Sequence, residues 1–195
     1  MYEIVRTFLR LIFRVFFRWE ITGRENIPAE GGVIIAANHV SLFDPPVLGC
    51  AISKRRIHFM AKEELFAIPI FGWLITKFHA FPVRRGVADR TAIRTTISLL
   101  EQGEVVGVFP EGTRSKTGML GKAEPGVAMI ASKVGATVVP AALTGTNKVF
   151  RDGFIFSRFT VKFGEPIKVD KAKADKETLD ALSRKIMDEI AILLK

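Results

Sequence analysis

Apolar residues recur along the chain with two different periods. Short apolar runs that end at turn residues predict strands at 19–22, 33–37, 57–61, 79–83, 104–109, 137–143 and 159–163. Longer segments with apolar residues at helical spacing predict helices at 88–102, 126–134 and 174–194. Because strands and helices alternate, the pattern indicates an α/β fold with a mixed, largely parallel sheet and helices on both faces.

Residues 3–19 carry an amphipathic pattern and contain neither Gly nor Pro. At 100° per residue, Glu3, Thr7 and four arginines occupy an arc of about 120°, and apolar side chains cover nearly all the rest of the helix. Arginine opposite phenylalanine and tryptophan is typical of helices in a membrane interface, although a helix packed on the core with solvated arginines fits the same pattern. We expect residues 1–20 to form an amphipathic membrane-interface helix that precedes the main domain, residues 21–195. The side chains expected to anchor it are Arg6, Arg10, Arg14, Phe13, Phe16 and Trp19.

Charge and composition narrow the class of partner. Lysine and arginine number 29 against 20 acidic residues, and the net charge of +9 indicates an anionic partner. The 16 phenylalanines favour lipid over nucleic acid, because the sequence shows neither a helix-turn-helix pattern nor base-stacking aromatics among its basic residues. Cys50 is the single cysteine, so an intrachain disulfide is excluded and a reducing compartment is favoured.

Membrane attachment is expected without a spanning helix. Arginines interrupt the first apolar segment, which therefore does not fit a secretion signal. The apolar stretch 68–82 contains Pro69, Gly72 and Lys77 and falls short of the roughly 20 apolar residues of a span, which favours a buried or membrane-dipping segment. We therefore expect a peripheral or monotopic protein on the cytoplasmic face of the cell membrane.

A candidate general base follows the apolar run 33–37. His39 stands there, and sites in open α/β sheets gather beyond the carboxyl ends of strands. Asp44 comes five residues later, across a turn that two prolines stop, and can accept a hydrogen bond from the imidazole Nδ1–H. Such a pair also fits a helix cap or a buried turn. The sequence has no G-x-S-x-G elbow to supply a nucleophile, so the attacking oxygen is expected to belong to the substrate.

Basic residues follow three further strands and predict a phosphate site. Backbone N–H groups of a glycine-containing turn and an arginine guanidinium can bind a phosphate, whereas a carboxylate cannot, so Glu111 is expected to position Arg114 or its loop. A metal site is not expected, because none of the three histidines has a ligand-like His or Cys nearby. The candidates for the phosphate site are Lys62, Arg84, Glu111, Gly112, Thr113 and Arg114.

In order and spacing, five sequence blocks resemble the successive motifs of the glycerolipid acyltransferase family. The blocks lie at 38–44, 61–65, 81–84, 109–115 and 138–141. The likeness covers about residues 20–165 and is greatest to bacterial 1-acylglycerol-3-phosphate acyltransferases. By this resemblance His39 is the general base with Asp44 as its partner, and Pro140 lies near the acyl chain. Lys62, Arg84 and Arg114 would bind the glycerol phosphate.

The resemblance also implies a reaction and its partners. Residues 21–195 would be an acyltransferase domain that moves a fatty acyl group from acyl-CoA or acyl carrier protein to the free sn-2 hydroxyl of lysophosphatidate, without a cofactor. The expected partners are an anionic membrane surface, the lysophospholipid and the acyl donor, with no nucleic acid. Alternatives are acylation of glycerol 3-phosphate or another lysolipid, thioester hydrolysis by water, and a non-enzymatic lipid- or nucleic-acid-binding module.

Overall fold

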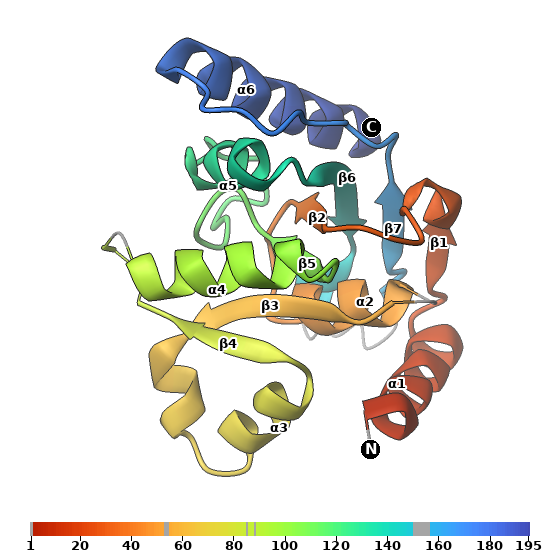
Figure 1. Ribbon diagram of the computed structural model, residues 1–195. Helices are drawn as coiled ribbons and strands as arrows, with labels where there is room; N and C mark the ends of the chain where they lie inside the picture. Colours follow the sequence, from red (N-terminus) through yellow and green to blue (C-terminus); the bar gives the residue numbers. More distant parts are fainter. Residues whose placement is uncertain (1, 53–54, 85, 88, 150–156) are drawn as a thin grey trace.

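The computed structural model describes residues 2–52, 55–84, 86–87, 89–149 and 157–195. Within these ranges, seven strands form one sheet in the order β1-β7-β6-β2-β5-β3-β4 (Figure 1). Strands β6, β2, β5, β3 and β4 are parallel, β7 is antiparallel to β6, and β1 is parallel to β7. The predicted mixed, largely parallel sheet is confirmed, with each strand within one residue of its expected ends. The strands are β1 (Glu20–Thr22), β2 (Val33–Ala37), β3 (Ile57–Lys62), β4 (Ala80–Val83), β5 (Val105–Val108), β6 (Thr137–Thr144) and β7 (Thr160–Phe163).

Helices cover both faces of the sheet, and each face has its own hydrophobic core. Helices α4 (Arg90–Glu101), α5 (Gly126–Val134) and α6 (Lys176–Leu193) pack on one face, whereas α1 (Tyr2–Phe16) and α2 (Asp44–Ala51) pack on the other (Figure 1). Strand β2 lies between the two cores with all five residues fully buried. Burial on both sides explains why its sequence is continuously apolar rather than alternating.

Two helices fall where the sequence pattern did not predict them. Pro45 and Pro46 were expected to stop a turn, but they occupy the first turn of α2. Proline is tolerated there because its missing N–H has no intrahelical partner at a helix start. Helix α3 (Phe71–Lys77) lies inside the stretch 68–82 and contacts β4. It comes after the 3₁₀ turn η2 (Glu63–Ala67). Two further 3₁₀ turns are η1 (Arg24–Asn26) and η3 (Thr146–Lys148).

The N-terminal helix ends at Phe16, earlier than expected, because Arg18 adopts a left-handed backbone with φ of 42°. This bend turns Phe17 back into the core, where its ring stacks on Phe159 at a centroid distance of 4.3 Å. In the described part of the chain, every helix is too short or too polar to cross a bilayer.

The arginines of α1 divide into two groups. Arg6 is only 7% exposed, and Arg10 donates hydrogen bonds to the carbonyls of Cys50 (2.8 Å) and Ile52 (2.7 Å) at the end of α2. Both were expected at the lipid surface but point into the protein, because the last carbonyls of α2 have no partners within their own helix. Of the other expected anchor residues, Phe13 is buried, Trp19 is half-buried, and Arg14 and Phe16 are exposed.

Candidate active site

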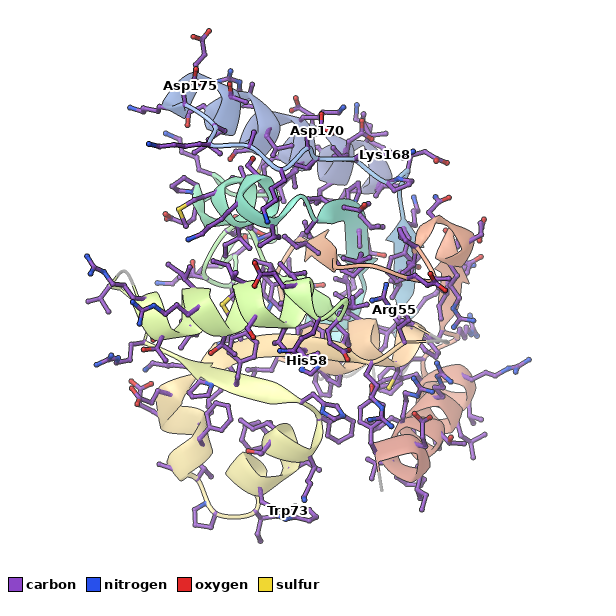
Figure 2. The ribbon with its side chains drawn as sticks, viewed as in Figure 1. Arg55, His58, Trp73, Lys168, Asp170 and Asp175 are labelled. Atoms are coloured by element: carbon purple, nitrogen blue, oxygen red, sulfur yellow. The ribbon has the colours of Figure 1, made fainter. Side chains whose placement is uncertain are left out.

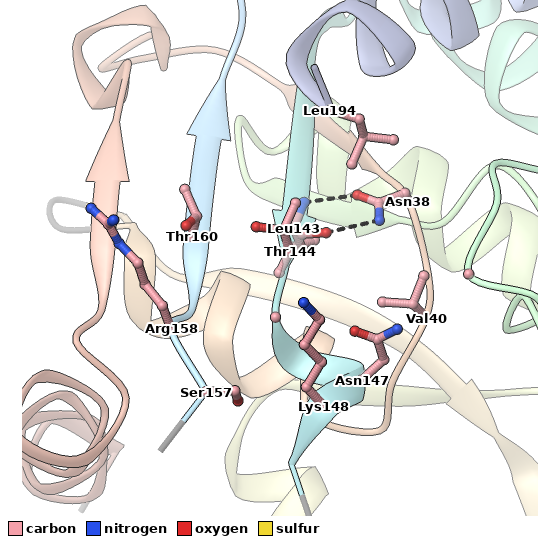
Figure 3. A pocket seen from close by; sticks show the side chains of 12 residues that line it. Asn38, Val40, Leu143, Thr144, Asn147, Lys148, Ser157, Arg158, Thr160 and Leu194 are labelled. Atoms are coloured by element: carbon pink, nitrogen blue, oxygen red, sulfur yellow. Dashed lines mark hydrogen bonds between the residues drawn. The ribbon is translucent and has the colours of Figure 1, made fainter. Parts of the chain in front are cut away.

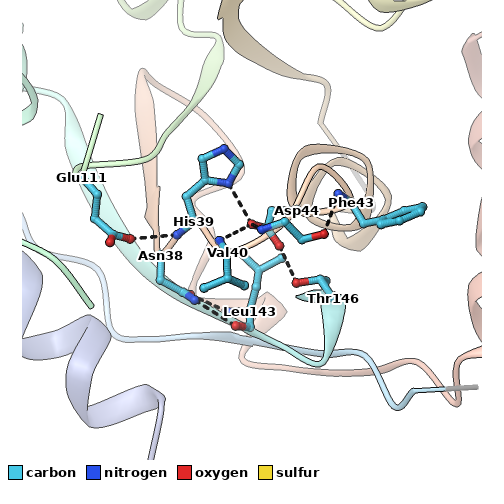
Figure 4. A network of polar contacts seen from close by, with 9 residues as sticks. Asn38, His39, Val40, Phe43, Asp44, Glu111, Leu143 and Thr146 are labelled. Carbon is cyan, nitrogen blue, oxygen red and sulfur yellow. Dashed lines mark hydrogen bonds and ion pairs between the residues drawn. The ribbon is translucent and has the colours of Figure 1, made fainter. Parts of the chain in front are cut away.

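A histidine and an aspartate form a buried pair where β2 meets α2. His39 Nδ1 lies 2.8 Å from Asp44 Oδ2, and the two side chains are 6% and 0% exposed (Figure 4). His39 follows the carboxyl end of β2, and Asp44 opens α2, so the intervening loop folds the carboxylate back onto the ring. The pair predicted from sequence is therefore assembled, with the first turn of a helix taking the place of the expected turn.

The hydrogen bonds around Asp44 determine the tautomer of His39. The Asp44 carboxylate also accepts the backbone N–H groups of Val40 (2.6 Å) and Ser41 (2.7 Å) and the hydroxyl of Thr146 (2.5 Å). A carboxylate that accepts from so many donors acts as an ionised acceptor, so Nδ1 of His39 must carry the proton. In the neutral ring, Nε2 is then a free base, and none of the described residues forms a hydrogen bond to it.

Thr146 completes the pair and was not anticipated from the sequence. It lies 102 residues after Asp44, in η3 just beyond β6, and is 1% exposed. Because β6 is parallel to β2, the residues that follow both strands meet at one edge of the sheet. The only signal in the sequence is that Thr146 follows the apolar run 137–143.

Aromatic stacking fixes the plane of the imidazole. The His39 ring stacks on Phe109 at a centroid distance of 4.1 Å, and Phe109 stacks in turn on Phe59. Gly107 on β5 leaves room for this stack, since a Cβ there would lie 2.3 Å from Cε1 of Phe59. The orientation of the His39 ring therefore depends on Phe109 just after β5, on Phe59 of the neighbouring β3, and on the space that Gly107 leaves for them.

Glu111 ties the catalytic loop to the loop that follows β5. Its Oε1 accepts the backbone N–H of His39 and its Oε2 accepts that of Gly121, both at 2.9 Å. The backbone N–H of Ser115 donates to the carbonyl of His39 at 2.8 Å. The expected role of positioning the loop is therefore visible at Gly121, and Glu111 holds the backbone of His39 as well, whereas these two hydrogen bonds do not involve Arg114.

The predicted cations share the sheet edge with His39 but do not contact the pair. Lys62 forms an ion pair with Glu64 at 2.9 Å, and the Arg84 guanidinium lies 3.8 Å from Asp89. Backbone hydrogen bonds, first from Arg84 and then from the start of α4, hold the pKa of Asp89 below its usual value. Arg114 is exposed and makes no hydrogen bond or ion pair with the described residues. Arg85, which shares the Arg84 block, lies outside those residues.

Three further predicted residues occupy distinct places. Gly112 adopts a φ of +66° in the turn after β5, which explains a glycine at this position, and Thr113 beside it is exposed. Pro140 is buried in the middle of β6, and a Cβ on Gly164 would lie within 3.2 Å of both Pro140 and Leu193. Pro140 therefore faces α6, on the side of the sheet opposite α2. Within the described residues, no three His, Cys, Asp or Glu side chains are grouped to hold a metal ion.

An oriented histidine base with a free Nε2, at the strand edge of an α/β sheet and beside exposed cations, is suited to activating a hydroxyl on a phosphorylated substrate. This arrangement fits a group-transfer enzyme in which the substrate supplies the nucleophile. The family model named Acyltransferase matches residues 18–144, and the chain belongs to the acyltransferase family.

Several proteins that resemble the chain share one activity in their names. The chain is 35% identical over 170 residues to the 1-acyl-sn-glycerol-3-phosphate acyltransferase of Bacillus subtilis, and the alignment covers 86% of this chain and 82% of that one. It is 31% identical over 193 residues to the Streptococcus pneumoniae enzyme of the same name, covering 94% and 70%. The crystal structure of the 1-acyl-sn-glycerophosphate acyltransferase PlsC from Thermotoga maritima superposes with a TM-score of 0.78 at 30% identity, covering 99% of this chain and 79% of that one.

Proposed function

We propose that the protein transfers a fatty acyl group from a thioester to the sn-2 hydroxyl of lysophosphatidate, which yields phosphatidate. The observation that carries this proposal is the oriented His39 with its free Nε2, joined through the Ser115 N–H to the loop that carries the exposed Arg114. The names of the Bacillus and Streptococcus relatives support lysophosphatidate as the acceptor. The reaction needs no cofactor, because the thioester already contains its leaving group.

In the proposed mechanism, Nε2 of His39 removes the proton from the acceptor hydroxyl as that oxygen attacks the thioester carbon. The tetrahedral intermediate then expels the thiolate, which takes the proton back from the imidazolium. The carbon–sulfur bond is replaced by a carbon–oxygen bond, and the histidine returns to its neutral form. Asp44 stabilises the imidazolium between these steps and keeps the ring in one tautomer.

The acceptor phosphate is proposed to bind near Arg114. Lys62 is the last residue of β3, and Arg84 and Arg114 follow β4 and β5. These three strands lie together on one side of β2. Among the described residues, Arg114 forms no ion pair, so it can bind a phosphate directly. Lys62 and Arg84 would first have to break their ion pairs with Glu64 and Asp89. We expect Arg114→Ala to raise KM for lysophosphatidate about tenfold or more with a smaller effect on kcat, because a charge-assisted contact is lost.

We further propose that the protein binds the cytoplasmic face of the cell membrane through α1. Ile4, Phe8, Leu11 and Val15 form one exposed stripe along this helix, on the side away from Arg6 and Arg10. Arg14 on the same helix and Arg18 just beyond its end are exposed and can contact anionic headgroups. An apolar stripe next to arginine is typical of helices that lie in the interface.

Acyl transfer with purified protein tests the proposed reaction. Palmitoyl-CoA and lysophosphatidate in mixed vesicles should give phosphatidate by mass spectrometry and free thiol in equal amounts. His39→Ala should lower kcat by about 10²-fold or more, because general-base catalysis contributes factors of this size. His58→Gln is the matched control, since His58 lies on β3 and pairs with Glu104 rather than with His39 or Asp44.

Two results would contradict the proposed function. Thiol release that does not depend on the acceptor would identify a hydrolase. A His39→Ala protein that binds vesicles and still transfers the acyl group at the wild-type rate would exclude His39 as the base.

A further inference from the structure

A hollow of about 520 Å³ opens beside the catalytic loop, on the side of β2 away from the predicted phosphate cations. Asn38 and Val40 form one wall, and residues at the end of β6, in η3 and at the start of β7 form the others (Figure 3). This volume lies within the range of about 300–1,000 Å³ that is usual for ligand sites. Apart from Asn38 and Val40 in the catalytic loop, the residues that line the hollow belong neither to the His39–Asp44 pair nor to the predicted phosphate site.

Two cations lie on the walls of the hollow, and no acidic residue is among the described residues that line it. Lys148 in η3 is exposed, and Arg158 before β7 is exposed and paired on one side with Glu20 (Figure 3). Ser157, next to Arg158, is 92% buried, and its hydroxyl has no hydrogen-bond partner in the described part of the chain. A buried hydroxyl without a partner is costly, so its presence beside two cations indicates a polar ligand that satisfies it.

The strand order separates the hollow from the predicted acceptor site. His39 follows β2, the acceptor cations follow β5, β3 and β4 on one side, and the hollow lies at β6 and β7 on the other. The backbone N–H of Val40 donates to Asp44, so the wall of the hollow and the dyad belong to one loop. A transferase that forms no acyl-enzyme must hold donor and acceptor at the same time, and the hollow offers a second position that is separate from the acceptor cations.

Resting on the proposed function, we propose that this hollow binds the phosphopantetheine arm of the acyl donor. Lys148 and Arg158 would bind its phosphate, and the amide of Asn147 and the hydroxyl of Ser157 would bind the amides and hydroxyl of the arm. Coenzyme A and acyl carrier protein share this arm, so the same contacts serve either donor. Gly118, whose ideal Cβ lies 3.7 Å from Nδ2 of Asn147, brings the loop after β5 over the hollow.

Steady-state kinetics with both donors tests the proposal. In the double variant K148Q/R158Q, KM for palmitoyl-CoA and for palmitoyl-acyl carrier protein should each rise about tenfold, with kcat and KM for lysophosphatidate unchanged within about twofold. Lys133→Gln, at a lysine beside a separate hollow along α5, is the matched control for lost charge. A rise with palmitoyl-CoA alone would assign the cations to the nucleotide and overturn the arm assignment. A rise in KM for lysophosphatidate instead would assign the hollow to the acceptor and overturn the proposal.

Ser157→Ala and direct binding distinguish this proposal from the proposed reaction. Since the hydroxyl has no partner, Ser157→Ala should leave the melting temperature unchanged or raise it while KM for both donors increases. Calorimetry with coenzyme A, pantetheine and 3′,5′-ADP should show binding by coenzyme A and loss of that binding in K148Q/R158Q. Binding by 3′,5′-ADP that equals binding by coenzyme A would overturn the proposal. If the protein bound coenzyme A here but transferred nothing to lysophosphatidate, the proposed acceptor would fail and the donor site would stand.

Discussion

At the scale of single residues, the chemistry depends on how completely the carboxylate of Asp44 is satisfied. It accepts two backbone N–H groups, one hydroxyl and the imidazole, and it is fully buried. Burying a charge is costly unless such contacts replace water. The same contacts that allow a buried carboxylate also direct the proton of His39 to Nδ1, so stability and catalysis depend on the same hydrogen bonds.

Thr146→Val should lower both the stability of the protein and its catalytic rate. Valine has the shape of threonine but cannot donate to Asp44 Oδ1, which leaves one lone pair of a buried charge without its partner. We expect a loss of about 1–3 kcal/mol in the free energy of unfolding, measured by urea titration. We also expect a lower kcat and a displaced pH–rate profile, whereas Thr146→Ser should restore the wild-type profile. A wild-type profile for Thr146→Val would show that the hydroxyl has no part in positioning the base.

Gly107→Ala should disturb the base without touching it. The new methyl group would meet the ring of Phe59 at 2.3 Å and Ile57 at 2.9 Å, so the stack that supports Phe109 and His39 must shift. We expect overpacking of about 1–3 kcal/mol, measured as a lower melting temperature and urea midpoint, together with a fall in kcat. Gly126→Ala, at the start of α5 where a Cβ meets nothing within 4 Å, is the control. Unchanged kcat in a destabilised Gly107→Ala protein would separate the ring stack from catalysis.

At the scale of elements, helix α2 is held at both ends. Its first residue belongs to the dyad, and its last carbonyls accept hydrogen bonds from Arg10 and from Arg24, whose Nε lies 2.7 Å from the carbonyl of Ala51. Cations at a helix C-terminus also offset the negative end of its dipole. Burial lowers the pKa of Arg10 and of Arg24, but both guanidinium groups stay charged at physiological pH.

Arg10→Met should loosen α1 from α2, and Cys50 can report the change. Cys50 is buried beneath α1, and this burial raises the pKa of its thiol to about 11. The native protein should therefore react slowly with iodoacetamide at pH 8, where the thiol stays protonated, and Arg10→Met should react several times faster. Arg14→Met, at an exposed arginine on the same helix, is the control. Equal rates in the two variants would show that Arg10 does not hold the helices together.

The same thiol predicts how stability depends on pH. In the unfolded chain the cysteine ionises near its ordinary pKa, whereas in the native protein it stays protonated up to about pH 11. Stability should therefore be constant with respect to this group below about pH 9 and fall as pH rises from about 9 to 11. Urea titrations at pH 8 and pH 10.5 should show a larger loss for the wild type than for Cys50→Ala.

At the scale of the whole molecule, exposed apolar side chains gather near the N-terminus. The stripe on α1 is one group, and Ile68, Ile70, Phe71 and Trp73 around α3 are another. Ring contacts of Tyr2 with Phe78 and His79 show that the two segments are neighbours, and Trp73 lies at the outer tip of α3 (Figure 2). Exposed apolar groups of this kind are typical of surfaces that bind a membrane or a partner, which is consistent with the binding proposed for α1.

F8E/L11E should weaken binding to phosphatidylglycerol vesicles about tenfold or more, because each substitution replaces apolar area that enters the interface with a charge that anionic lipid repels. Ile192→Glu, at an exposed isoleucine on α6, should bind as the wild type does. Trp73 fluorescence should shift to shorter wavelength on vesicle binding if α3 also enters the interface. Sedimentation with vesicles gives the affinity, and equal binding by F8E/L11E would exclude the stripe as the contact surface.

Much of the sheet and the dyad could be predicted from the sequence, because strand periodicity and motif spacing are local features. The identity of α2 could not, since Pro45 and Pro46 fit a turn as well as a helix start. Thr146 and the backbone contact of Glu111 depend on residues about 70 to 100 positions apart, which strand order alone brings together. The helical pattern of α1 located its arginines but not the direction they face, which depends on the unpaired carbonyls of α2.

The hydrogen bonds of Arg10 have a consequence for anyone who would exchange the first helix. A transplanted amphipathic helix with the same apolar stripe, but with lysine in place of arginine, would keep its attraction for vesicles. It would lose the forked donation to Cys50 and Ile52, because an ammonium presents a point charge rather than a planar pair of N–H groups. Such a chimera should sediment with lipid but have a lower kcat, so α1 cannot be replaced by just any amphipathic helix that binds membranes.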